Sequence, residues 1–158
     1  MKSVLLTLLA AALLGITPIR AEAQQDVTAP IRQFLDGLNA HDDKSANAAY
    51  ATGDIIIVDE VAPHSWSGTN APQQWGADLD KHDAAAGVSD GVVKYDAPTR
   101  VESGTDSAYL VVPTVYLYKE RGKQMAEEAQ MTFVLRRQSG AWKISGWVWS
   151  GVKPHPAK

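Results

Sequence analysis

Asp59, His64 and Trp66 lie within eight positions of one another, and these residue types can do acid–base chemistry. Asp59 follows a β-branched run at 55–58, so a strand would carry its carboxylate to the edge of an apolar region. A carboxylate in that position is suited to take a proton from a substrate, and His64 is a candidate partner. The simpler interpretation is that Asp59 begins a solvated loop and that His64 lies on its surface.

Three tryptophans could line or cover a binding site. Trp147 and Trp149 share one face of a strand near the C-terminus, because side chains alternate along a strand. Two indoles on one face need a cover, which is either a pocket or a second copy of the chain. We therefore expect a homodimer as one way to bury them. Trp66 serves either as a lid over a pocket or as a plug at the edge of the core.

Polar side chains on two long strands are further candidates for ligand contacts. Tyr116 alternates with apolar neighbours on one strand, and Glu127 and Glu128 lie on the next. One of these two glutamates must point inward. We expect Glu128 to do so and to form a polar line in the pocket with Thr132. The alternative is that both positions are exposed at the edge of a strand.

Other reaction classes find no support in the sequence. The chain has no cysteine and four scattered histidines without ligand spacing, so we expect no metal site. A serine triad and a glycine-rich phosphate loop are missing, and we expect no cofactor. The net charge is −3 and the basic residues cluster only at 136–137, so we expect no nucleic-acid partner.

The N-terminus resembles a secretory signal peptide. Lys2 precedes an apolar run at 4–16, which is too short to span a bilayer comfortably. Ala21-Glu22-Ala23 has the small-x-small pattern of a cleavage site. We predict that residues 1–23 are removed and that residues 24–158 form one exported domain, periplasmic or secreted, without a membrane attachment. The alternative is a retained N-terminal anchor.

The rest of the chain reads as helices followed by strands. Apolar spacing predicts a helix at 27–40, a short helix at 46–50, and a helix that begins at Asn70 and ends near Gly87. The first strand, 55–59, has the composition of a strand buried on both faces, and 61–69 reads as a loop. Further strands are predicted at 88–95, 98–102, 108–119, 125–137 and 140–150, and 153–158 as a frayed end. This order predicts an α+β domain whose curved antiparallel sheet wraps around three N-terminal helices.

Several short motifs stand in the same order as these elements: Tyr50-Ala51-x-x-Asp54, Val58-Asp59, Trp66-Ser67-Gly68, Ala108-Tyr109, Gly140-x-Trp142-Lys143-Ile144 and Trp149-Ser150. Together they resemble the nuclear transport factor 2-like superfamily, which includes ketosteroid isomerases and SnoaL-like proteins. The resemblance covers nearly all of the chain after residue 23. It implies a cone-shaped fold with a pocket inside the cone.

The resemblance also implies roles for individual residues. In ketosteroid isomerases a carboxylate late in the first strand moves a proton, and a tyrosine and an acid stabilise the oxyanion. Asp59 falls at the position of the base, whereas Phe34 replaces the tyrosine and Thr132 the acid. Loss of even one such donor costs about 3 kcal/mol in known cases, which argues against steroid isomerisation.

We therefore expect a SnoaL-like domain that binds a small apolar or aromatic molecule in its cone pocket. A catalytic form would use Asp59 and His64 for the proton transfer of an isomerase, dehydratase or cyclase. The alternative is a non-catalytic dimeric interaction domain with a filled cone. The expected ligand-binding residues are Phe34, Trp66, Tyr116, Glu128, Thr132, Trp147 and Trp149.

Overall fold

The helices of this protein precede most of its strands. The computed structural model describes residues 26–157, so the predicted signal peptide, residues 1–23, lies outside the described residues. Between residues 26 and 157 no helix has the length and apolar character needed to cross a membrane. The elements in chain order are α1 (Ala29–Asn39), α2 (Asp43–Ala48), β1 (Ile55–Val58), β2 (Ser65–Gly68), α3 (Ala71–Ala86), β3 (Val88–Tyr95), β4 (Arg100–Ser103), β5 (Ser107–Glu120), β6 (Lys123–Gln138), β7 (Ala141–Gly151) and β8 (His155–Pro156).

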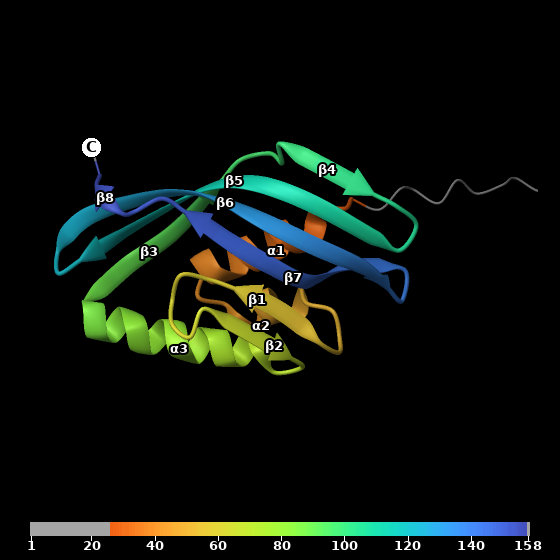
Figure 1. The fold of residues 1–158 in the computed structure, drawn as a ribbon, viewed down its shortest axis with the longest axis horizontal. Helices are drawn as coiled ribbons and strands as arrows, with labels where there is room; N and C mark the ends of the chain where they lie inside the picture. The colour runs from red at the N-terminus through yellow and green to blue at the C-terminus, as the bar shows by residue number, and fades with distance from the viewer. Residues whose placement is uncertain (1–25, 158) are drawn as a thin grey trace, which may run out of the picture.

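One curved sheet organises the whole described chain. Its strands run in the order β2-β1-β7-β6-β5-β3, with β4 paired to β5 and β8 paired to β6. The long strands β5, β6 and β7 curve over α1 and α2, while α3 runs beside β1 and β2 (Figure 1). The predicted α+β cone fold is confirmed. One pairing departs from the antiparallel pattern, because β1 runs parallel to β7.

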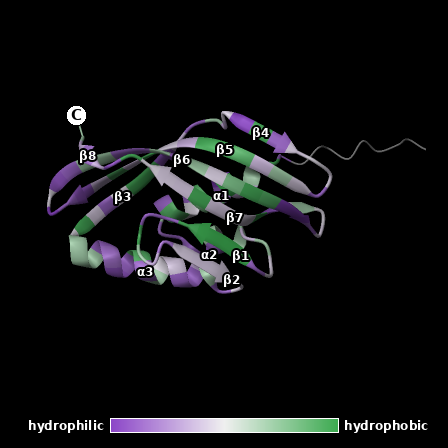
Figure 2. Cartoon of the chain, in the orientation of Figure 1, coloured by the Kyte–Doolittle hydropathy of each residue, from purple (hydrophilic) through white to green (hydrophobic). Residues whose placement is uncertain are grey.

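The core lies between the concave face of the sheet and the helices. On β6 the inward side chains alternate, and Met131, Phe133 and Leu135 are buried. From α1, Phe34 and Leu35 meet them at helical spacing. Apolar colour marks β1 and patches of the long strands, whereas α3 is a mixture of hydrophilic turns and weakly apolar ones, with an apolar C-terminal end (Figure 2). Asp80 and Asp83 of α3 line a cavity next to the core.

Three local predictions were wrong. β1 is not buried on both faces, because Ile56 is 60 % and Val58 36 % exposed. Part of the predicted loop forms β2, which pairs with β1 although Ser65–Gly68 lacks a β-branched run. The predicted frayed end forms β8, which pairs with the start of β6 at an edge where proline is tolerated.

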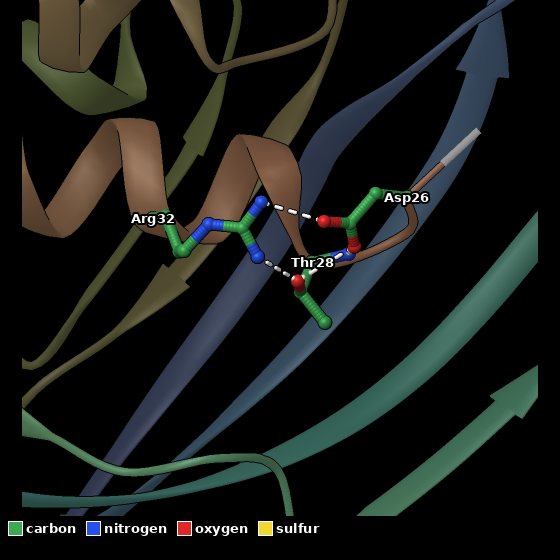
Figure 3. Close-up of polar contacts among 3 residues, drawn as sticks. All are labelled: Asp26, Thr28 and Arg32. Atoms are coloured by element: carbon green, nitrogen blue, oxygen red, sulfur yellow. Dashed lines mark hydrogen bonds and ion pairs between the residues drawn. The ribbon is translucent and has the colours of Figure 1, made fainter.

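A polar cluster fixes the start of α1 (Figure 3). The Asp26 carboxylate accepts hydrogen bonds from the Thr28 backbone at 2.8 Å, the Thr28 hydroxyl at 2.7 Å and Arg32 Nη2 at 2.6 Å. Arg32 also donates to the Thr28 hydroxyl. These donors, the Thr28 hydroxyl first, lower the pKa of Asp26 to about 2. The cluster holds the first turn of the helix that carries Phe34 into the interior.

Candidate functional site

A cavity of about 760 Å³ lies between the helices and the open end of the sheet. Its walls come from α1, α2, the residues after β1, α3, and the inner faces of β3, β5 and β7. An aromatic cluster closes it at the core. The ring centroids of Trp75 and Trp147 lie 5.0 Å apart in an edge-to-face arrangement, and Phe34 lies 5.9 Å from Trp147. A ligand in the cavity would therefore rest on aromatic surface.

Two polar groups flank this aromatic surface, and an indole N–H holds each of them. Trp75 Nε1 donates to Asp59 Oδ2 at 2.6 Å, and the backbone N–H of Glu60 donates to Asp59 Oδ1 at 2.6 Å. Trp147 Nε1 donates to the Tyr50 hydroxyl at 2.7 Å. Burial raises the pKa of Tyr50. Its hydroxyl accepts from Trp147, so its own proton is available for donation to a ligand.

Two carboxyl groups, those of Glu60 and Glu127, meet on the β5–β6 side of the cavity. Glu127 points inward from β6, is 1 % exposed, and accepts a hydrogen bond from Trp149 Nε1 at 2.7 Å. Its other oxygen, Oε2, has no amide, indole or hydroxyl donor within the described residues. The Glu60 carboxyl lies beside it. Burial, the hydrogen bond with Glu127 and the charge of Asp59 raise the pKa of Glu60 to about 8. These effects favour the protonated form of Glu60.

Two glycines make room for this arrangement. A Cβ atom at Gly151 would lie 1.5 Å from Glu127 Oε1, so only glycine leaves space for the buried carboxyl. A Cβ atom at Gly91 would lie 2.4 Å from the Tyr116 hydroxyl. Tyr116 sits directly opposite Glu127 in the β5–β6 register, on the same inner face. The inner face at this end of the sheet is thus shaped around Glu127 and Tyr116.

The cavity wall is strongly acidic. It carries carboxyl groups from the loop after β1, from α3, and from positions near α2 and β3, and among the described residues no lysine or arginine lines it. His41 and His82 also line the cavity. Burial raises the pKa of Asp83 as well, and the charges of Asp80 and Asp59 add to that effect. An anionic ligand would meet repulsion in this cavity.

Four of the residues predicted from sequence line the cavity: Phe34, Asp59, Tyr116 and Trp149. Trp147 is buried in the core behind them, so the shared strand face of Trp147 and Trp149 points to the interior. Trp66 is a core residue rather than a lid. It is 5 % exposed, and its indole donates to Asp78 Oδ2 at 3.0 Å.

Three other predicted residues lie elsewhere. Glu128 points to the opposite face of the sheet from Glu127, is 56 % exposed, and pairs with His155 at 2.8 Å. Thr132 lies four residues after Glu128 on the same strand and therefore on the same face, so it also faces away from the cavity. The expected inward polar line of Glu128 and Thr132 was therefore wrong. His64 has an exposed side chain outside the cavity wall, although its carbonyl accepts from the Asp59 backbone at 3.1 Å.

Sequence reasoning missed four residues of the cavity wall, Tyr50, Glu60, His41 and His82, and it favoured Glu128 over Glu127 as the inward glutamate. A signal for Glu127 exists in the chain. Met131, Phe133 and Leu135 are buried at every second position of β6. The same spacing toward the N-terminus places Glu127, and not Glu128, on the buried face. No comparable signal marks the histidines, because they line one cavity only when α3 is placed beside the turn after α1.

The comparisons with known proteins define the class of fold. No protein-family profile matches the sequence, and no curated protein matches it significantly. Among solved structures, a type 2 hexachlorocyclohexane dehydrochlorinase, LinA, is similar with a TM-score of 0.68 at 14 % identity, over 84 % of this chain and 86 % of that chain. A nuclear transport factor 2-like superfamily protein from Salmonella enterica has a TM-score of 0.65 at 17 % identity, over 85 % and 91 %.

A ketosteroid isomerase-like protein from Erwinia carotovora is also similar, with a TM-score of 0.62 at 18 % identity, over 80 % of this chain and 94 % of that chain. The chain therefore has the nuclear transport factor 2-like fold that ketosteroid isomerase-like proteins share. Identities this low establish the fold and leave the chemistry to be argued from the cavity itself.

Proposed function

We propose that this protein binds a small aromatic or apolar molecule in its cone cavity and transfers a proton within it, as an isomerase or lyase does. The observation that carries the proposal is the pairing of Asp59 and Tyr50 around one aromatic surface. Each lines the cavity, and each is held by an indole N–H, at 2.6 Å and 2.7 Å respectively. A fixed acceptor and a fixed donor are the two groups that proton abstraction requires.

The roles follow from the chemistry of the two groups. Asp59 would take a proton from a carbon or oxygen atom of the ligand. The Tyr50 hydroxyl would donate a hydrogen bond to the oxygen on which negative charge develops. Phe34 replaces the tyrosine that stabilises the oxyanion in ketosteroid isomerases, and phenylalanine cannot donate a hydrogen bond. Tyr50 would supply the missing donor from another position. The dehydrochlorinase and the ketosteroid isomerase-like protein among the structural neighbours are compatible with such chemistry.

The alternative of an interaction domain with a filled cone is less well supported, because a cavity of about 760 Å³ is within the size range of ligand pockets.

Export and a homodimeric state remain part of the proposal. Export is inferred from residues 1–23, and the dimer from exposed apolar side chains on the outer face of the sheet, Ile56, Val134 and Tyr109.

A cavity-blocking variant tests binding. Gly76 lies on α3 in the cavity wall, and a Cβ atom there meets nothing within 4 Å. Gly76→Trp should fill the cavity while the fold is retained, since glycine is a poor helix residue. Gln74→Trp, at an exposed position of the same helix outside the cavity wall, is the matched control. Native mass spectrometry should detect a bound small molecule in the control and none in Gly76→Trp; equal occupancy in both would refute the cavity as the site.

Deuterium exchange tests the chemistry even when the product of the reaction has not been identified. The ligand found by mass spectrometry is incubated with the protein in heavy water, and deuterium uptake at its carbon atoms is followed. Wild-type protein should catalyse uptake, Asp59→Asn should abolish it while binding persists, and Tyr50→Phe should slow it on the order of a hundredfold. Uptake that is unchanged in Asp59→Asn would remove Asp59 from the mechanism.

A further inference from the structure

The carboxyl pair of Glu60 and Glu127 has no role in the proton transfer proposed above. It lies on the β5–β6 side of the cavity, and Glu60 is itself part of the cavity wall. Two carboxyl groups in contact cannot both be ionised at little cost, so a proton or another cation must lie between them. The Glu127 carboxyl oxygen Oε2 is buried and has no amide, indole or hydroxyl donor among residues 26–157.

Three aromatic side chains, Tyr116, Tyr118 and Trp149, line the same cavity as Glu60. The rings of Tyr116 and Tyr118 stack with centroids 4.7 Å apart, and both residues line the cavity. Trp149 lines it as well and donates to the other oxygen of Glu127. Carboxylates next to aromatic faces attract organic cations, because the ring faces carry negative potential. An anionic or purely apolar ligand would use none of these groups.

An organic cation fits the site better than a metal ion does. Among residues 26–157 no three histidine, aspartate or glutamate side chains converge in a way that could hold a metal. An ammonium group has three N–H donors and needs acceptors rather than a coordination shell. Glu127 Oε2 and the Glu60 carboxyl are two such acceptors, and Asp83 of α3 adds negative charge on the same side.

We propose that the Glu60–Glu127 pair binds the ammonium group of a cationic aromatic amine, which takes the place of the proton that the two carboxyl groups share. This inference rests on the proposed function, in which the aromatic part of the ligand lies on Trp75 and Phe34. It adds that the same ligand carries a positive charge. On binding, Glu60 loses its proton to the solvent, and its carboxylate pairs with the ammonium group. One proton is therefore released for each amine bound.

The proton release gives the binding a characteristic pH dependence. The pKa of Glu60 is raised to about 8, so below that pH the amine must displace a proton and binds more weakly. The titratable groups that face Glu60 are Asp59 beside it, Asp83 from α3, Tyr116 and Tyr118 from β5, and Glu127 from β6. Affinity for the amine should rise between pH 6 and pH 8, whereas affinity for a neutral analogue should not.

Three probes with a common phenyl group test the proposal by isothermal titration calorimetry: phenethylamine, phenethyl alcohol and phenylacetate. Wild-type protein should bind the amine on the order of tenfold more tightly than the alcohol, with phenylacetate weakest. The buffer takes up the released proton, so the measured heat of amine binding should depend on the ionisation enthalpy of the buffer. At pH values well below 8, the slope of that dependence should correspond to one proton released for each amine bound. Glu127→Gln should lose the preference for the amine and keep its affinity for the alcohol.

Glu128→Gln is the matched control, because it makes the same change one residue away on the opposite face, and it should behave as wild type. Should Glu127→Gln fail to fold, as judged by circular dichroism, Glu60→Gln serves as the second variant and should also lose the preference. Equal affinity for amine and alcohol in the wild type, or an intact preference in the folded variant, overturns the inference and leaves the proposed function standing. Absence of binding by all three probes overturns both.

Discussion

Trp75 and Asp59 are joined by a hydrogen bond of 2.6 Å from the indole nitrogen to Oδ2, and this bond ties α3 to the end of β1. The same indole packs edge-to-face on Trp147 of β7. One side chain thus connects a helix, the first strand and the last long strand. It also sets the direction of the carboxylate that we propose as the base.

A double-mutant cycle should measure this bond. We expect Trp75→Phe and Asp59→Ala each to lower the free energy of unfolding, with a coupling energy of about 1 kcal/mol or more, because the acceptor is a partly buried carboxylate. Urea denaturation of the two single variants and the double variant gives the value. A coupling energy near zero would show that the bond does not hold Asp59 in solution.

Gly151 should tolerate no side chain. We expect Gly151→Ala to lower the free energy of unfolding by about 1–3 kcal/mol, since the new methyl group overlaps the Glu127 carboxyl. Gly76→Ala is the control, because its Cβ has free space on a helix, and it should raise stability by about 0.5–1 kcal/mol. Adding Glu127→Ala to Gly151→Ala should restore part of the loss; a further loss in the double variant would contradict the overlap.

The pH dependence of stability should report on Glu60. The ordinary pKa of a glutamate is 4.5 and that of Glu60 is raised to about 8, so the folded state holds a proton that the unfolded state releases. Its contribution to stability is present below pH 4.5 and is lost as pH rises through about 8. Burial also raises the pKa of Asp83 in the same region, so a residual slope from Asp83 is expected.

Glu60→Gln should therefore flatten the decline between pH 5 and pH 8, since glutamine imitates the protonated acid. Urea denaturation at several pH values measures this, with Glu102→Gln on the exposed strand β4 as the control that keeps the wild-type profile. An equal decline in wild type and Glu60→Gln would mean that Glu60 ionises normally in the folded protein.

The outer face of the sheet should form the dimer contact that we propose. Ile56, Val134 and Tyr109 lie in one row across β1, β7, β6 and β5, with Gly146 between the first two, and all three apolar side chains are exposed. We expect a dimer by sedimentation velocity, and we expect Val134→Lys to yield folded monomers. A wild-type monomer at micromolar concentration would refute the contact.

The order and type of the main elements could be predicted because the apolar periodicity is strong. Helix 27–40, the helix from Asn70 to Gly87 and the long hairpins all appear near their expected bounds. β2 could not be predicted, because Ser65–Gly68 is a strand only through its pairing with β1. The β-branched composition of β1 predicts burial on both faces, yet one face is exposed. Composition alone does not say whether a second layer covers a strand.

The candidate site was only half predictable. Asp59 was found from its position after a β-branched run, and Tyr116 and Trp149 from their place on long strands. Glu128 shares a strand face with Thr132, which the resemblance places in the pocket, whereas the alternation of the buried apolar residues on β6 places Glu127 inward. The Glu60–Glu127 contact depends on where the loop after β1 meets the β5–β6 hairpin, and local sequence carries no information on that distance.

The parallel pairing of β1 with β7 bears on how the chain acquires its structure during synthesis. Ile57, two residues before the proposed base, pairs with Trp147 of β7, so the aromatic surface under the cavity needs this strand. A nascent chain whose residues 141–151 are still inside the ribosome cannot close this core. This core is therefore expected to fold only after residues 141–151 have left the ribosome, which keeps the preceding residues open to chaperones while they are synthesised.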